Sequence, residues 1–155
     1  MIKSFALSLT LAAAHVPAFA QGPLSVTSTA MVETKMQAPD GTTKVTLAPA
    51  RRVVPGDRVV FVVTYRNTGA ATLSDVAIVN PVPNAVAYRS PANGSPAPDV
   101  SVDGRTFGQL PLLRVTGTAG ARPATVDDVT HVRWRLSRPL TAGGEGRFAY
   151  QAVLK

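Results

Sequence analysis

The sequence predicts an all-β protein, an antiparallel β-sandwich of about seven to nine short strands, on three observations. Apolar and polar residues alternate with a period of two along most of the chain after residue 23, as they do in strands with one buried face. Clusters of Gly, Pro, Asn and Asp separate these segments at short intervals. No long segment has the 3.6-residue period of a helix, which argues against a parallel sheet with helical crossovers. With 45% hydrophobic and 16% charged residues, the composition is that of a folded protein.

The first 20 residues are typical of a signal peptide. Lys3 provides a positive charge, an apolar stretch occupies residues 5–14, and Ala18-Phe19-Ala20 is the small-x-small pattern that signal peptidase recognises. The apolar stretch is shorter than the roughly 20 residues that span a bilayer, which argues against a membrane anchor. We therefore expect cleavage before Gln21 and an exported single domain, residues 21–155, in the periplasm, at the cell surface or outside the cell. No later segment is long and apolar enough to span a membrane.

The mature chain begins with four expected strands separated by three turns. The strands are residues 24–36, 42–47, 58–66 and 72–80, and the turns are Asp40-Gly41, Pro55-Gly56-Asp57 and Asn67-Thr68-Gly69. Both faces of residues 58–66 are largely apolar, which predicts a central strand that is covered in part on both sides. Residues 24–36 are long enough to pair within their own sheet or within a neighbour's, and the sequence leaves these alternatives open. Pro81 and Pro83 should end the fourth strand, since Pro has no amide to donate.

The second half of the chain predicts fewer and shorter strands. Residues 86–88 form a strand before a loop at 91–98, and a small hairpin is expected between 100–102 and 105–107 around Asp103-Gly104. Residues 114–128 look irregular and polar. In residues 131–137 the alternation places Trp134 in the core and Arg133 and Arg135 in water. The last strand, residues 147–154, should bury its aromatic side.

Residues 55–91 resemble a known family. PGDRVVFVVTYRNTGAATLSDVAIVNPVPNAVAYRSP is similar to the conserved-repeat domain of bacterial and archaeal surface proteins, called domain of unknown function number eleven. The ending VRWRLSRPLTAGGEGRFAYQAVLK, residues 132–155, is similar to that family's last two strands. This chain differs in having Asn80 where Asp is usual, Gly143-Gly144 in place of Pro-Gly, and one copy of the domain. The resemblance implies an Ig-like sandwich and a role at the cell surface, and it implies no catalytic residues.

The residues offer little basis for catalysis or for a cofactor. The chain has no Cys, which excludes disulfides and thiolate chemistry, and no Walker loop or GxGxxG motif. Asp40, Asp57 and Asp103 stand beside Gly in turns, where carboxylates cap amides. The pair Asp127-Asp128, with Asp99 or Asp103, is the one candidate for Ca²⁺, but calcium-loop spacing is absent. His131 is expected at the surface without a second metal ligand, and Asn93-Gly94-Ser95 matches a glycosylation sequon. We expect no enzyme activity, cofactor or metal.

The best candidate for a binding feature is a set of arginines. Of 16 basic residues, 12 are Arg, and the net charge of +7 becomes +6 when Lys3 leaves with the signal peptide. If the last two strands form a hairpin, one exposed face gathers Arg133, Arg135, Arg138 and Arg147, which could bind phosphate or carboxylate groups. Such a face can equally serve solubility and protect a sheet edge. No exposed aromatic residues are interleaved with these arginines, so nucleic-acid binding is not expected.

Two functions follow as hypotheses. The first is an exported, non-catalytic Ig-like module that acts through protein–protein contacts in the periplasm or at the cell surface, with an envelope protein or a second copy as its partner. The second is a soluble binder of an anionic envelope ligand, such as lipopolysaccharide or an acidic glycan, that uses the arginine face.

Overall fold

The computed structural model describes residues 22–37, 39–49, 54–118 and 120–155, and within them the fold is almost entirely antiparallel β-structure. The all-β prediction is confirmed, while residues 1–20, the expected signal peptide, lie outside the described residues. The largest sheet has the strand order β2-β1-β3-β10-β5, a second has the order β4-β9-β6, and β7 pairs with β8 alone. The strands are β1 (Leu24–Gln37), β2 (Thr43–Pro49), β3 (Arg58–Asn67), β4 (Ala77–Pro81), β5 (Val86–Pro91), β6 (Asp99–Ser101), β7 (Arg114–Gly117), β8 (Gly120–Pro123), β9 (His131–Arg135) and β10 (Glu145–Leu154).

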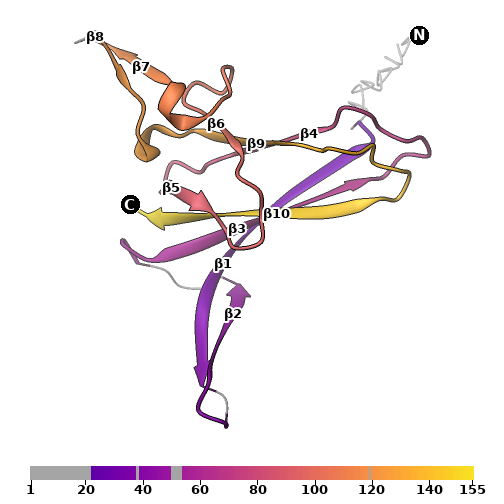
Figure 1. Cartoon of the computed structure of the whole chain (residues 1–155), viewed down its shortest axis with the longest axis vertical. Coiled ribbons are helices and arrows are strands. Elements are labelled where there is room, and N and C mark those ends of the chain that lie inside the picture. The colour runs from indigo at the N-terminus through magenta and orange to yellow at the C-terminus, as the bar shows by residue number, and fades with distance from the viewer. Residues whose placement is uncertain (1–21, 38, 50–53, 119) are drawn as a thin grey trace, which may run out of the picture.

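The two larger sheets lie in two layers with one hydrophobic core between them (Figure 1). Trp134 on β9 is only 3% exposed, as its alternation predicts, and it faces Tyr150 and Phe148 from β10 of the other layer. Phe61 on β3 stacks on Tyr150 with ring centroids 5.2 Å apart. Aromatic pairs at such distances add about 0.5–1.5 kcal/mol each beyond their area burial. The core is therefore centred on aromatic rings that both layers contribute.

The strand β3 lies between β1 and β10, which confirms it as a central strand. Its inward residues Val59, Phe61 and Val63 are buried, and so is Val60 on the opposite face. The fourth expected strand begins later than predicted, at Ala77 instead of residue 72. Asp75 has a φ of 52°, a left-handed conformation that extended backbone does not contain, so the strand cannot run through it.

Two further expectations about local structure are wrong. Residues 105–107 form no strand, since β6 pairs with β9 and meets residue 108 only in an isolated bridge. The carboxylate of Asp103 accepts hydrogen bonds from the amides of Arg105 and Thr106, which turns this segment into a capped loop. Residues 114–117 and 120–123, expected to be irregular, pair as the strands β7 and β8. Two short 3-10 helices, η1 (Leu110–Leu112) and η2 (Val126–Asp128), flank these two strands.

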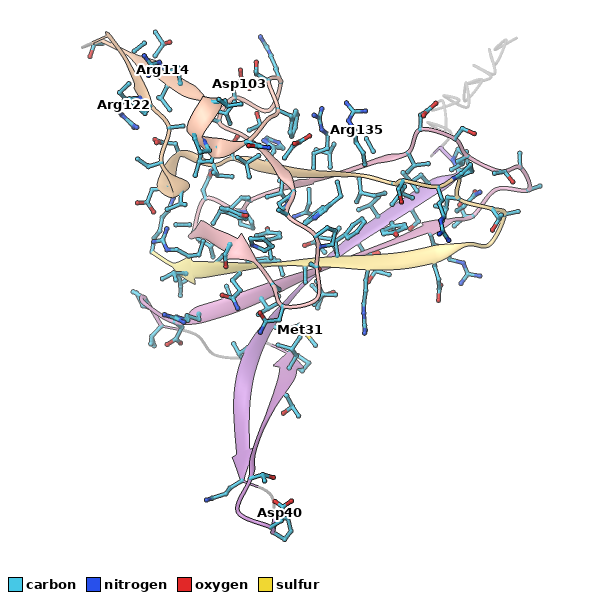
Figure 2. The ribbon with its side chains drawn as sticks, viewed as in Figure 1. Met31, Asp40, Asp103, Arg114, Arg122 and Arg135 are labelled. Atoms are coloured by element: carbon cyan, nitrogen blue, oxygen red, sulfur yellow. The ribbon has the colours of Figure 1, made fainter. Side chains whose placement is uncertain are left out.

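The hairpin of β1 and β2 projects from the two layers as an arm (Figure 1). The strand β1 pairs with β3 from Leu24 to Val32 and with β2 from Met31 to Gln37, so its two halves have neighbours on opposite sides. Figure 2 shows Met31 at the base of the arm and Asp40 at its tip. The tip has the predicted turn, in which Gly41 has a φ of 82° and Asp40 Oδ1 accepts from the amide of Thr42. The strand β1 thus pairs with β2 and β3 of its own sheet.

Candidate functional site

The structure separates the arginines that the sequence grouped together. The strand β9, with Arg133 and Arg135, pairs with β4 and β6, whereas β10, with Arg147, pairs with β3 and β5 in the other layer. The last two strands do not form the hairpin on which the grouping of Arg147 with Arg133 and Arg135 depended. The connection between them crosses from one layer to the other, and it is held there by backbone hydrogen bonds between Leu73 and Leu140 and between Asn67 and Gly143.

Arg133 is occupied by contacts within the protein. Its Nη2 lies 2.9 Å from Asp99 Oδ2, and its guanidinium lies 4.4 Å from the ring centroid of Phe107. The Arg133 side chain is only 18% exposed, so the expectation that it lies in water is wrong. An ion pair combined with a cation–π contact holds this group in place, and it is not available to an external anion.

Arg135 and Arg138 remain exposed and line the same hollow. Figure 2 shows Arg135 on the outer side of the smaller layer. The hollow has a volume of about 470 Å³ and its wall includes apolar atoms of Tyr65, Leu136 and Phe148. Burial raises the pKa of Tyr65 above its usual value, so the phenol in this wall is neutral at physiological pH. A hollow with two cations and an aromatic wall suits a ligand with both acidic and apolar parts.

Arg147 lies instead beside a groove on the outer face of the larger sheet. This groove has a volume of about 500 Å³, and Val60, Val62 and Leu47 supply apolar atoms to its lining. Leu47, on β2, is 44% exposed. The sequon residues Asn93-Gly94-Ser95 also line the groove, where the hydroxyl of Ser95 accepts a hydrogen bond from the amide of Ala149. The four predicted arginines are therefore divided among three environments.

The acidic residues considered for Ca²⁺ are engaged elsewhere. Asp127 pairs with Arg89 at 2.7 Å, Asp99 pairs with Arg133, and Asp103 caps its own loop. Within the described ranges, no group of three or more His, Cys, Asp or Glu side chains is close enough to hold a metal ion. The prediction that turn carboxylates cap amides is confirmed at Asp103, and also at Asp40 and Asp57.

His131 is less exposed than expected from the sequence. Its ring is half-buried, its Nδ1 lies 3.0 Å from Thr130 Oγ1, and it meets Phe107 edge-on. A side chain at Gly104 would come within 2.9 Å of the imidazole, so the loop around Gly104 closes directly over the ring. The histidine is a packing residue beneath this loop.

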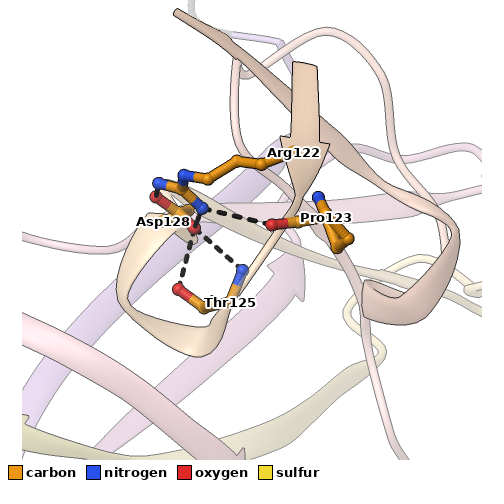
Figure 3. A network of polar contacts seen from close by, with 4 residues as sticks. All are labelled: Arg122, Pro123, Thr125 and Asp128. Carbon is orange, nitrogen blue, oxygen red and sulfur yellow. Dashed lines mark hydrogen bonds and ion pairs between the residues drawn. The ribbon is translucent and has the colours of Figure 1, made fainter. Parts of the chain in front are cut away.

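Asp128 is the centre of a polar cluster near the β7–β8 hairpin (Figure 3). Both of its carboxylate oxygens accept from Arg122 at 2.7 Å, and Oδ2 also accepts from the amide and hydroxyl of Thr125. The guanidinium of Arg122, followed by the Thr125 donors, lowers the pKa of Asp128 far below its usual value. The cluster links β8 to η2, so it fixes the hairpin to the rest of the molecule.

We expect Asp128→Asn to lower the melting temperature at neutral pH and to have a smaller effect in acid. A carboxyl with a lowered folded-state pKa stabilises the fold above its unfolded pKa of about 4 and loses that contribution as the pH falls. Thermal unfolding of the wild type and the variant from pH 7 to pH 3 would measure the difference. Asp127→Asn is the matched control, because the Asp127–Arg89 pair is exposed and contributes little. Equal destabilisation of Asp128→Asn at both ends of the range would contradict the assignment.

The part of β1 before the arm provides the second candidate surface, one made of backbone. On the side of β1 away from β3, residues 24–30 have no neighbouring strand among those that the structure describes, because β2 pairs only from Met31 onward. Exposed strand edges bind other strands through main-chain hydrogen bonds. Sequence reasoning identified the long strand but could not find the open edge, since the position of β2 sets it.

These observations define a class of protein: two layers of antiparallel sheet around an aromatic core, with a projecting hairpin and an open strand edge. No family model matches the chain, and no curated protein or solved structure is similar enough to it to count as a relative. Among the described residues, no helix has the length and apolar character needed to cross a membrane.

Proposed function

We propose that this protein is an exported, non-catalytic Ig-like module that acts through protein–protein contacts in the periplasm or at the cell surface. The observation that carries the proposal is the arm formed by β1 and β2, which extends away from the two layers and has outer edges that no other described strand pairs with. Its backbone groups and the exposed Leu47 are available to a partner, while the core keeps its base rigid.

The Ig-like assignment is supported by the two layers and by the position of Trp134. The sandwich has antiparallel sheets of five and three strands, and its tryptophan packs at the centre of the core against rings of the opposite sheet. The resemblance of residues 55–91 and 132–155 to the conserved-repeat domain points to the same fold and to the cell surface. Export is supported by the signal-peptide pattern of residues 1–20.

A variant with a shortened arm tests the proposal. Thr34 and Thr46 face each other in the β1–β2 register, so residues 35–45 can be replaced by a two-residue Asn-Gly turn that joins these strands. Wild type and variant would each be used to capture proteins from the envelope fraction of the source cells. We expect the wild type to enrich a partner that the variant loses, with unchanged melting of the core. Equal capture by both proteins would contradict a role for the arm.

A second function, binding of an anionic envelope ligand, is favoured by the hollow that Arg135 and Arg138 line. Lipopolysaccharide combines phosphate groups with acyl chains, which matches the cations and the aromatic wall of this hollow. The double substitution Arg135→Gln and Arg138→Gln should weaken binding to purified lipopolysaccharide, and added salt should weaken it in the wild type.

The matched control for this test is the double substitution Arg105→Gln and Arg114→Gln, which removes the same charge from exposed positions outside the hollow. Titration calorimetry at low and high salt would measure each protein. Binding that neither the hollow variant nor salt changes would contradict the second function.

A further inference from the structure

The turn between β5 and β6 presents an Asn-Gly pair to solvent. The amide of Ser95 donates to the carbonyl of Ala92 at 3.0 Å, so residues 92–95 form a β-turn with Asn93 and Gly94 at its centre. Gly94 has a φ of 80°, a conformation that glycine adopts without strain. Both central residues are exposed, and no described atom beyond the adjacent residues lies within 4 Å of the place that a Cβ on Gly94 would occupy. The peptide bond between them is therefore open to water.

The ends of this turn are fixed to β10, while the groups at its centre are free. The amide of Ala92 donates to the carbonyl of Ala149 at 3.0 Å, and the amide of Ala149 donates to Ser95 Oγ at 2.7 Å. Among the described residues, nothing is hydrogen-bonded to the side chain of Asn93 or to the amide of Gly94. The carboxamide of Asn93 and the nitrogen of Gly94 can therefore approach each other without breaking another contact.

A second turn, residues 83–86, provides a close comparison. The amide of Val86 donates to the carbonyl of Pro83, also at 3.0 Å, and Asn84 and Ala85 occupy the centre of the turn, both exposed. The difference is that alanine follows the asparagine. The Cβ of Ala85 crowds its own nitrogen and restricts the rotation that would bring this nitrogen to the side chain of Asn84. We therefore expect Asn84 to be much less reactive than Asn93 at a similar exposure.

The other two of the four asparagines are protected by the fold. Asn67 is fully buried, and its side chain makes four hydrogen bonds. Asn80 is 4% exposed, and it precedes Pro81, whose nitrogen carries no proton. Asn93 is thus the asparagine in which exposure, free reacting groups and a following glycine occur together.

We propose that Asn93 is a site of spontaneous deamidation. Base removes the amide proton of Gly94, the nitrogen attacks Cγ of Asn93, and ammonia leaves Cγ with a proton from water as a succinimide ring closes. Water then opens the ring. Cleavage of the bond between Cγ and the Gly94 nitrogen gives aspartate at position 93, whereas cleavage of the original peptide bond gives isoaspartate, in which the main chain runs through Cγ. Each event consumes one water and releases one ammonia.

The reaction places a carboxylate at the edge of the groove on the outer face of the larger sheet. Asn93 and Arg147 both line this groove. In the part of the chain that the structure describes, no carboxylate forms an ion pair with Arg147. The new charge therefore lowers the positive potential that Arg147 gives to the groove. In the isoaspartate product, an extra main-chain atom also lengthens a turn whose two ends are held by Ala149, so an aged molecule presents a different groove from a new one.

Mass spectrometry of tryptic fragments tests the proposal. Trypsin cleaves after arginine, and so it places Asn93 in fragment 90–105 and the other three asparagines in fragment 67–89. When the purified wild type is incubated for several days at pH 8, a growing share of fragment 90–105 should become about 1 Da heavier and separate into two products. Fragment 67–89 should keep its mass. The gain should be faster at pH 9 than at pH 7, because base removes the proton from the attacking nitrogen.

Three variants assign the reaction to the Asn93-Gly94 pair. Gly94→Ala should slow the mass gain by about tenfold or more, because a Cβ then crowds the nitrogen. Asn93→Gln should remove the gain, because the longer side chain would have to close a larger ring. Ala85→Gly is the reciprocal variant, which gives the second turn its own Asn-Gly pair, so fragment 67–89 should then gain mass. This variant keeps the test valid where Gly94→Ala alters the first turn, since it forces no alanine into the conformation of Gly94.

A synthetic peptide of residues 88–98 separates the effect of the folded turn from that of the sequence. We expect the mass gain in both the peptide and the folded protein. If fragment 90–105 of the folded protein keeps its mass, the inference is overturned, and a gain in the peptide would then show that the turn holds the two groups apart. Equal gain in the two fragments of the wild type would also overturn it. The reaction requires no partner, so its outcome is independent of the capture experiment with the shortened arm.

Discussion

Replacing Asn67 with Ala should lower the free energy of unfolding by about 3 kcal/mol, measured by urea denaturation at neutral pH. Asn67 is fully buried at the end of β3. Its Nδ2 donates to the carbonyls of Ala71, Leu140 and Thr141 at 2.7–3.1 Å, and its Oδ1 accepts from the amide of Gly69. Truncation would remove these four hydrogen bonds, each of which contributes about 1 kcal/mol. The carbonyls of Leu140 and Thr141 keep their bonds from the amides of Leu73 and Gly144, which limits the loss.

The substitution Asn67→Asp separates the hydrogen bonds from the volume of the side chain. It keeps the shape and the acceptor for Gly69, but it places a carboxylate against three carbonyl oxygens. Both the burial and this repulsion raise the folded-state pKa of the new carboxyl above its unfolded value of about 4. A raised carboxyl pKa means that the variant loses stability as the pH rises, so we expect it to be more destabilised at pH 7 than at pH 4.

Asn93→Ala is the matched control for Asn67, because Asn93 is an exposed residue and its truncation should change stability by less than about 0.5 kcal/mol. An Asn67→Asp variant as stable as the wild type at neutral pH would show that the three carbonyl oxygens around this side chain do not disfavour a carboxylate. The result also tests the role of Asn67 in the turn Asn67-Thr68-Gly69, which was predicted from the sequence. The same side chain also holds residues 140–141, which sequence inspection could not connect to it.

The contrast between local and long-range features explains what the sequence could predict. The alternation in residues 58–66 predicted a central strand, and the alternation around Trp134 predicted its burial, because strand periodicity is a local property. The partners of β9 and β10 depend on the connection that crosses between layers, which is fixed by contacts with residues 67 and 73. Assuming that consecutive strands pair gave the wrong arginine face.

The β7–β8 hairpin was missed for a different reason. Its strands are exposed on nearly every residue, so they carry no apolar alternation from which a strand could be predicted. What holds the hairpin is the Arg122–Asp128 cluster, which depends on two side chains meeting in the folded chain. The burial of Arg133 was missed for the same reason. Contacts with Asp99 and Phe107 set the position of its side chain, and the alternation within its own strand does not reveal them.

The second large effect is expected at Tyr150, where Tyr150→Ala should lower the free energy of unfolding by about 3–5 kcal/mol. Tyr150 has no exposed surface, and its ring contacts Phe61 and Tyr88 of its own sheet and Trp134 of the other. Removing the ring would leave a cavity at the junction of the two layers. Leu112→Ala provides a contrast, because Leu112 is 77% exposed and its loss should have little effect.

Tyr150→Phe separates the ring from its hydroxyl. The hydroxyl lies 3.3 Å from Asn80 Nδ2, so its removal should cost about 1 kcal/mol or less. Burial raises the pKa of the Tyr150 phenol above its usual value. A phenol with a raised folded-state pKa stabilises the fold below an unfolded pKa of about 10 and loses that contribution as the pH rises. The wild type should therefore lose more stability than Tyr150→Phe between pH 9 and pH 11.

A double-mutant cycle with Tyr150→Leu and Trp134→Phe tests whether the two layers share one core. Each substitution is mild enough to leave a folded protein, and unfolding of the wild type, both single variants and the double variant can be followed by circular dichroism. Because the two rings lie 6.4 Å apart across the layers, we expect a coupling of at least about 0.5 kcal/mol. Strictly additive effects would mean that each sheet is stabilised independently. The arm would then lack the rigid base from which it presents its strands, since β1 is anchored by its pairing with β3 and by Leu24, Ala30 and Val32, which pack against that core.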